Sequence, residues 1–196
     1  DADHLYDRIN CVVARRLFDS GFATLIVNLL SPNEAVEDAE TSALRFHQSL
    51  LASRIVKLTQ WARRVPIFCG LRIGFFASGL CAGAVLAAAA VSPQVRAAVC
   101  CGPRADLVFS RLNRLRADVL VLAGQQDIAH LSASSRMRSH LPASAQVETL
   151  PNAGHLLDDP TAVDRLAVEA VWWFGRSLGS RRAEGRRHAD LLIETA

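Results

Sequence analysis

Apolar residues recur along the chain in two patterns, one typical of helices and one typical of buried strands. Residues from about Leu5 to Asp19 carry apolar side chains on one helical face, at Ile9, Val12, Val13 and Leu17. Ser20 and Gly21 end this helix, and the apolar run from Phe22 to Asn28 predicts a buried strand. The polar, acidic stretch from Ser31 to Glu40 predicts a loop.

The two patterns continue to alternate along the rest of the chain. They predict further helices at about Thr41–Arg64, Ala82–Ala90, Ser132–His140 and Thr161–Leu178. They predict further strands at about Leu71–Phe76, Val95–Cys101, Asp118–Ala123 and Gln146–Leu150. Short apolar strands that are separated by helices pair in parallel and are covered on both faces. We therefore expect an α/β fold, a three-layer α/β/α sandwich with a mostly parallel sheet of about five or six strands.

One domain accounts for most of the chain. With 196 residues, of which 51% are hydrophobic, the chain can bury one sizeable core and is short for two. We place this domain at residues 1–178. Residues 179–196 are polar as far as Leu191, and we expect them to form a mobile C-terminal tail rather than a binding arm.

Charge and hydropathy narrow the possible partners. A net charge of +3 is too small to indicate a nucleic-acid partner. The longest apolar run, Ala82 to Val91, is about half as long as a membrane-spanning helix needs to be. The chain does not open with a charged segment followed by an apolar one, as a secretory signal would. We therefore expect a soluble, cytoplasmic protein without a membrane partner, and the sequence leaves its oligomeric state open.

The five cysteines have apolar neighbours and do not form a C-x-x-C pair. This pattern favours neither a zinc site nor thioredoxin-like chemistry. We expect every cysteine except Cys81 to be a buried free thiol.

Cys81 occupies a position suited to nucleophilic catalysis. Ligands of a parallel sheet bind at the carboxyl ends of its strands, and residues 79–83, G-L-C-A-G, follow the second predicted strand. A nucleophile on a sharp strand-to-helix turn needs small residues two positions before and after it, which Gly79 and Gly83 provide. At a helix N-terminus the helix dipole also favours the thiolate.

Two further loops supply the partners of such a nucleophile. Asp127 follows the fourth predicted strand and His155 follows the fifth, so the chain order is nucleophile, acid, histidine, as in the α/β-hydrolase triad. In this hypothesis His155 takes the thiol proton, Asp127 orients the imidazole, and the backbone N–H of Ala82 forms half of an oxyanion hole. Taken singly, Asp127 could be a helix cap and His155 a surface or core residue.

Several stretches resemble one family over nearly the whole chain up to Leu178. These are A-R-R-L-F-D-S-G-F-A-T-L-I-V-N-L-L-S-P-N-E, G-F-F-A-S-G-L-C-A-G-A, V-R-A-A-V-C-C-G-P-R-A-D-L, V-L-V-L-A-G-Q-Q-D and L-P-N-A-G-H-L-L-D-D-P. On these residues the chain resembles the dienelactone hydrolase-like group of α/β hydrolases. The resemblance implies hydrolysis of a small-molecule ester or lactone by a Cys or Ser nucleophile, without a metal or organic cofactor. An acyltransferase with the same triad would have the same sequence pattern.

The chain departs from this family at the nucleophile. Bacterial relatives commonly read G-Y-F-G-A-S-T-G-A-A-A there, and without gaps their serine falls on Gly79. A shift of one residue matches Ser78, whose flanking residues Phe76 and Leu80 are bulky, and a shift of two matches Cys81. We favour Cys81, with Ser78 as the alternative nucleophile. The third alternative is a catalytically inactive relative that binds a ligand or another protein.

A second departure lies at the start of the chain. In the family, a strand precedes the first helix, lies between the first two strands identified here, and has a loop that supplies the other oxyanion N–H. The chain begins at Asp1, directly before that helix. We expect either that the sequence is a fragment lacking this strand or that the two flanking strands pair directly, and we favour the fragment.

Overall fold

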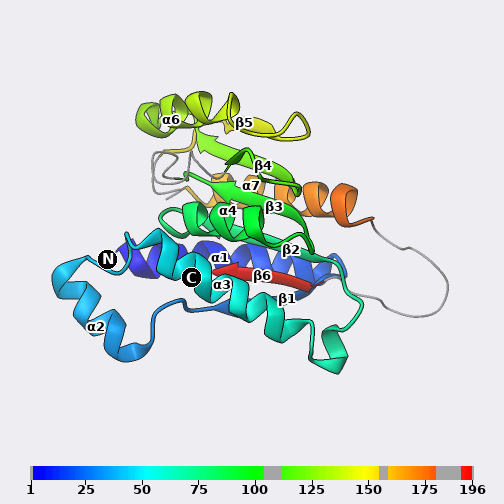
Figure 1. Cartoon of the computed structure of the whole chain (residues 1–196). Coiled ribbons are helices and arrows are strands. Elements are labelled where there is room, and N and C mark those ends of the chain that lie inside the picture. The colour runs from blue at the N-terminus through cyan, green and yellow to red at the C-terminus, as the bar shows by residue number, and fades with distance from the viewer. Residues whose placement is uncertain (1, 104–111, 155–158, 180–190, 196) are drawn as a thin grey trace.

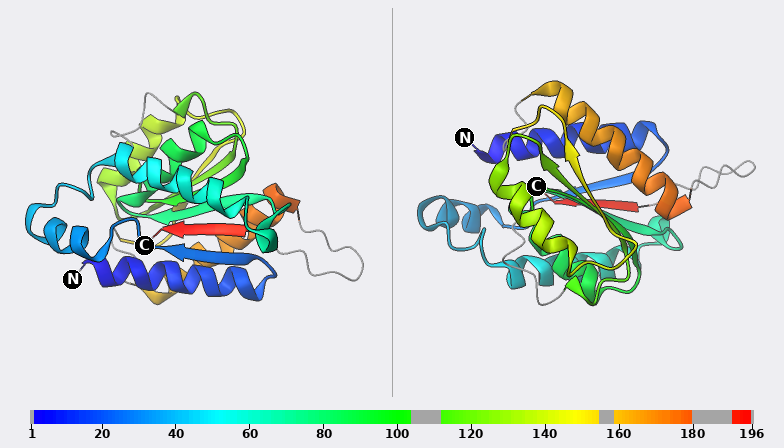
Figure 2. Two further views of the ribbon diagram at one scale, coloured as in Figure 1. Left: turned by 60° about the horizontal axis from the view of Figure 1, so that its bottom comes forward. Right: turned by 90° about the horizontal axis from the view of Figure 1, so that it is seen from above.

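Six strands form one sheet in which every paired neighbour is parallel, and helices cover both faces (Figures 1 and 2). The computed structural model describes residues 2–103, 112–154, 159–179 and 191–195. In sheet order the strands are β1 (Ala23–Val27), β6 (Leu191–Thr195), β2 (Ile73–Ser78), β3 (Val95–Cys101), β4 (Asp118–Gly124) and β5 (Gln146–Leu150). The helices are α1 (Ala2–Asp19), α2 (Pro32–Thr41), α3 (Gln48–Ala62), α4 (Cys81–Val91), α6 (Ile128–Arg138) and α7 (Pro160–Phe174).

Two hydrophobic clusters separate the layers and confirm the predicted three-layer fold. On one face, Ile9, Val13 and Leu17 of α1 are fully buried together with α7 and side chains of the central strands. On the other face, α3 and α4 bury a second cluster with Phe75 and Ala77 of β2. The view from above in Figure 2 shows α1 and α7 on one side of the sheet and α3, α4 and α6 on the other.

The stretch predicted as a polar loop, Ser31–Glu40, instead forms most of α2. Ser31 caps this helix, and its hydroxyl accepts a hydrogen bond from the N–H of Glu34 while the Glu34 carboxylate accepts one from the N–H of Ser31. This reciprocal capping box satisfies two backbone donors that a helix start would otherwise leave free. The local capping signal therefore outweighs the polar composition.

The long helix predicted from Thr41 to Arg64 begins only at Gln48, because the buried Asp38 carboxylate stabilises a turn before it. Asp38 accepts hydrogen bonds from the N–H groups of Leu44 and Arg45 and from the Arg45 guanidinium, at 2.6–2.9 Å. Burial alone would raise the pKa of Asp38, but these donors outweigh it and hold the pKa below its ordinary value. The carboxylate thus stays charged inside the turn.

The centre of the sheet differs from one of the two sequence-based expectations, that the strands flanking the missing position pair directly. The strands β1 and β2 do not pair directly, because β6 lies between them and pairs in parallel with each. Leu191–Thr195 therefore belong to the sheet, and the expectation that the whole of residues 179–196 is a mobile tail is wrong for these residues. The strand fills the position expected for the one that precedes the first helix.

The connection to β6 starts and ends at the same edge of the sheet. Gly179 has a φ of 69°, and its carbonyl accepts a hydrogen bond of 2.9 Å from Arg72, the residue before β2. Leu191 pairs with Ile73, the first residue of β2. The ends of the connection are therefore both anchored beside the start of β2.

Within the described residues, we find no helix with the length and apolarity needed to cross a bilayer.

We predict that Ile193→Pro will strongly destabilise the protein. Proline removes a backbone N–H from a strand that has neighbours on both sides, and an orphaned buried partner costs about 1–3 kcal/mol. The free energy of unfolding, measured by urea denaturation, should fall by at least that amount. The control Ile193→Val keeps the N–H and should lose much less. Equal stability of the Pro variant and the wild type would contradict the central position of β6.

Candidate functional site

The turn between β2 and α4 lies at the carboxyl edge of the sheet, as predicted. The residue with the positive backbone φ in this turn is Gly79. Gly79 has a φ of 61°, which glycine adopts at no steric cost, and its N–H donates a hydrogen bond of 2.8 Å to the carbonyl of Cys101. Cys81 is the first residue of α4, so the prediction that it lies at a helix N-terminus is confirmed. The expectation that Cys81 itself occupies the strained turn is wrong, because the reversal is completed two residues earlier.

Ser78 and Cys81 lie toward opposite faces of the sheet. In β2, Phe75 and Ala77 face the cluster with α3 and α4, whereas Phe76 faces α1 and α7. By strand alternation, Ser78 faces the same way as Phe76. Its side chain is buried, and the Ser78 hydroxyl has no hydrogen-bond partner among the described residues. Cys81 is half-buried and packs against the α3 and α4 cluster. The two candidate nucleophiles therefore lie in different surroundings.

The backbone of the turn is already hydrogen-bonded at the predicted oxyanion position. The N–H of Ala82 donates to the carbonyl of Gly79 at 3.2 Å, so Ala82 closes the first turn of α4 rather than presenting a free donor. The carbonyl of Leu80 accepts a hydrogen bond of 3.3 Å from the side-chain amide of Gln48 at the start of α3. Gln48 is buried and connects α3 to this turn, a contact that the sequence pattern does not reveal because it joins residues far apart in the chain.

Asp127 lies at the same edge of the sheet, after β4, and caps α6. One carboxylate oxygen, Oδ1, accepts a hydrogen bond of 3.1 Å from the N–H of His130, and the other, Oδ2, lies 2.7 Å from Nδ1 of the His130 ring. The two side chains are only 9% and 14% exposed. The sequence analysis missed His130, although the spacing D-x-x-H at a helix start places these side chains together.

Of the four cysteines expected to be buried, two follow the prediction and two do not. Cys100 and Cys101 are buried, whereas Cys11 and Cys69 are exposed, so the expectation of buried thiols is wrong for the latter two. Burial, with a smaller contribution from the negative charge of Asp127, raises the pKa of Cys101 to about 12. Burial also raises the pKa of Cys100 well above its ordinary value. Neither buried thiol can supply a thiolate near neutral pH.

The loop after β5 packs closely against the loop that carries Asp127. The N–H of Gln126 donates to the carbonyl of Ala153 at 2.9 Å. A Cβ atom on Gly124 would lie 2.6 Å from the oxygen of Ala153 and 2.7 Å from that of Gly154. Only glycine fits this close approach. His155, the predicted base, follows Gly154 directly and lies outside the described residues.

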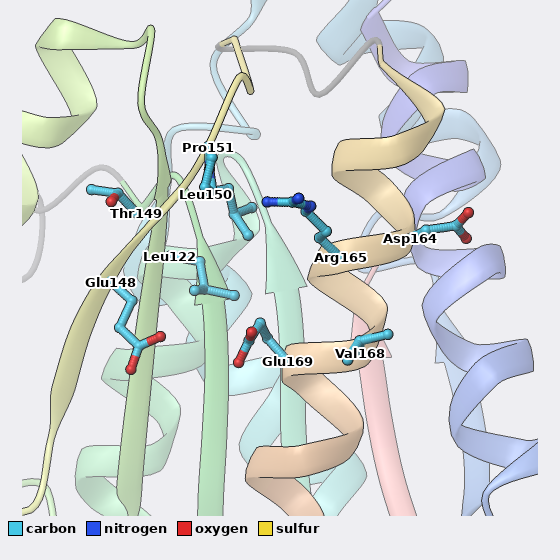
Figure 3. Close-up of a pocket in the computed structure, with 9 residues that line it drawn as sticks. All are labelled: Leu122, Glu148, Thr149, Leu150, Pro151, Asp164, Arg165, Val168 and Glu169. Atoms are coloured by element: carbon cyan, nitrogen blue, oxygen red, sulfur yellow. The ribbon is translucent and has the colours of Figure 1, made fainter.

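A cavity of about 310 Å³ lies between β5 and α7 (Figure 3). Leu122, Leu150, Pro151 and Val168 form apolar parts of its lining, and Glu148 and Glu169 line it as well. In Figure 3, Arg165 extends toward Leu150 and Pro151, while Asp164 points away from them.

Within the described ranges, His, Cys, Asp and Glu side chains do not gather in groups of three that could hold a metal ion.

We predict that Gly124→Ala will destabilise the junction between the loops after β4 and β5. The added methyl group would overlap two backbone oxygens, and overpacking of this kind costs about 1–3 kcal/mol. The matched control is Gly175→Ala, whose Cβ would meet no atom within 4 Å. Chemical denaturation should show a lower free energy of unfolding for Gly124→Ala alone, and equal losses in both variants would contradict the close approach.

Two solved structures of hydrolases and esterases are similar to this chain. A dienelactone hydrolase from Anabaena variabilis has a similar structure, with a TM-score of 0.85 and 35% sequence identity, covering 88% of this chain and 81% of that chain. Est1E from Butyrivibrio proteoclasticus shares the fold, with a TM-score of 0.59 and 12% identity over 68% of this chain and 71% of that one. No family model matches the sequence.

Two curated Mycobacterium tuberculosis proteins, from different strains, are similar in sequence. Each is 36% identical to this chain over 167 residues, which is 84% of this chain. Both are provisionally named as phosphoribosyl transferases. The chain spans only 37% of their length, so that name describes proteins with a large part outside the match.

Proposed function

Because this chain belongs to the dienelactone hydrolase-like group of α/β hydrolases, we propose that it hydrolyses carboxylic esters or lactones through a Cys81–His155–Asp127 triad. The observation that carries the proposal is the shared edge of the sheet, at which the start of α4 and the Asp127 loop both lie. The close packing of Ala153 and Gly154 against Gly124 supports the pairing of Asp127 with the residue that follows them. The free thiols at Cys11 and Cys69 suit a reducing cytoplasm, where we place this activity.

The proposed reaction proceeds by acyl transfer to sulfur. His155 removes the Cys81 proton, and the thiolate attacks the carbonyl carbon to form a tetrahedral intermediate. The intermediate collapses, and the leaving alkoxide takes the proton from His155. Water then attacks the thioester, with His155 again taking a proton, and releases the acid and the free thiol. Asp127 orients the imidazole throughout. Ala82 would have to turn its N–H from Gly79 toward the oxyanion.

A second candidate function, binding without catalysis, is favoured by one observation. Gly79 has the positive φ of the sharp turn, and this is the position on which the serine of bacterial relatives falls. A chain with glycine there lacks a nucleophile at the turn itself. The transferase activity in the names of the mycobacterial proteins is a weaker candidate, because this chain matches a minor part of their length and most of a dienelactone hydrolase.

We predict that Cys81 is the reactive thiol of the native protein. In a Cys11→Ser/Cys69→Ser variant, which removes the two exposed thiols, iodoacetamide at pH 7 should modify Cys81. Cys100 and Cys101 should remain unmodified, since their raised pKa leaves almost no thiolate. Peptide mass spectrometry measures the rates.

Replacing the proposed base tests the link to His155. His155→Gln should slow alkylation of Cys81 about tenfold, because an unassisted thiol is only a few per cent ionised at this pH. The control His140→Gln changes an exposed residue just after α6 and should leave the rate unchanged. Identical rates in the two variants would contradict a Cys81–His155 pair.

We predict that Gly79→Ser will lower turnover of p-nitrophenyl acetate. The new residue would have to adopt a positive φ, which costs about 1–2 kcal/mol, and would strain the turn before α4. Cys81→Ala should abolish the activity of the wild-type chain. An inactive wild type together with an active Gly79→Ser variant would favour the non-catalytic candidate instead.

A further inference from the structure

Helix α2 leaves most of its surface uncovered. Figures 1 and 2 show it projecting from the body of the molecule, next to the start of α3. Of its ten residues, all of them described, Asp38 alone is buried, and Val36 is 68% exposed. A helix of ten residues is too short to be stable on its own in water. Contacts with other surfaces therefore stabilise α2, and most of its own surface is available for one.

The exposed surface of α2 is acidic. Two of the four acidic residues in the helix are engaged within the chain, one by the Arg54 guanidinium and one by the turn that follows the helix. The other two, Glu37 and Glu40, are exposed and form no ion pair with the described part of the chain. Glu40 lies three positions after Glu37 and four after Val36, so the three side chains are neighbours on the helix surface. We call Glu37 and Glu40 the acidic pair.

The C-terminal half of α3 exposes the opposite charge. From residue 41 to residue 105 the sequence contains no acidic residue. Lys57 and Arg64, which we call the basic pair, are exposed and form no ion pair among the described residues. The N–H of Arg64 donates to the carbonyl of Trp61 at 2.8 Å, which keeps Arg64 in the last turn. At intervals of four and three residues, Lys57, Trp61 and Arg64 share one face of the helix.

A tryptophan lies between the two basic side chains. Trp61 is 50% exposed, and its ring packs edge-on against that of Phe68, with centroids 6.2 Å apart. Phe68 in turn packs against the buried cluster of α3 and α4. An aromatic side chain that is already held in place loses little conformational freedom on binding. Tryptophan and arginine are also the residues that most often carry the binding energy of protein interfaces.

We propose that two copies of this chain form a two-fold dimer, in which α2 of each copy packs on the C-terminal half of α3 of the other. The acidic and basic pairs lie toward opposite ends of the surface formed by α2 and α3, so a two-fold axis brings them together twice. Val36 of one copy then covers the exposed part of Trp61 of the second copy. Opposite charges guide the association and determine its register. This inference is independent of the proposed function.

Charge reversal tests the contact, measured by sedimentation velocity at micromolar to near-millimolar concentrations. The wild type should dimerise as its concentration rises, and added NaCl should weaken the dimer because exposed charge pairs are screened. Glu37→Lys/Glu40→Lys and Lys57→Glu/Arg64→Glu should each raise the dissociation constant of the dimer at least about tenfold, since like charges then meet at both contacts. Dimerisation as strong as that of the wild type in both variants would overturn the inference.

Mixing the two charge-reversed variants gives the sharpest result. In equal amounts they should form a mixed dimer with a dissociation constant close to that of the wild type, because both contacts again join opposite charges. This rescue also shows that both variants fold. The control Arg136→Glu/Arg138→Glu has the same net charge as the variant of the basic pair but changes exposed residues of α6, and it should keep the wild-type constant. Failure of the mixture to dimerise would overturn the inference.

Two further measurements separate this dimer from other uses of the basic pair. Trp61→Ala removes the apolar part of the contact without changing charge, and it should raise the dissociation constant about tenfold. An anionic membrane is the other surface that basic side chains around a tryptophan can bind. Vesicles of phosphatidylserine should therefore be tested by cosedimentation with the wild type and with Lys57→Glu/Arg64→Glu. A wild type that stays monomeric throughout, whether or not it binds the vesicles through the basic pair, would overturn the inference.

Discussion

The candidate chemistry depends on the parallel pairing of the strands, because only this pairing places every strand's carboxyl end at one edge. β2 brings the turn at Gly79 to this edge, and β4 brings the loop with Asp127. The hydrogen bond from the N–H of Gly79 to the carbonyl of Cys101 joins the turn to β3, and the N–H of Gly102, directly after β3, donates to the carbonyl of Leu122 in β4. A chain of short backbone contacts, rather than long side chains, therefore determines where the functional groups lie.

Elements with long apolar runs could be predicted from the sequence almost to the residue. Val95–Cys101 has the predicted bounds, because its apolar pattern is strong and local. α2 was missed although its capping box is visible in the sequence, since the acidic composition of the stretch suggested a loop. β6 could not be found in this way, because it follows a polar segment and its position is determined by β1 and β2, which are distant in the sequence.

The site was predictable only in part. The order of Cys81, Asp127 and His155 is visible in the sequence, and the structure places the first two at the ends of different strands. Glycine spacing alone could not show whether the sharp turn is at Gly79 or at Cys81. Gly79 can itself take the position of the family's serine, or it can be the small residue two positions before Cys81. The engagement of the Ala82 N–H and the contact of Gln48 with Leu80 depend on three-dimensional packing and leave no local signal.

The place of β6 has a topological consequence. β6 runs parallel to β1, so it ends at the carboxyl edge of the sheet, and α1, which leads into β1 from the opposite direction, starts at the same edge. Figures 1 and 2 show the two chain ends on the same side of the molecule. Both ends of the described chain therefore lie at the edge of the sheet that carries the candidate site.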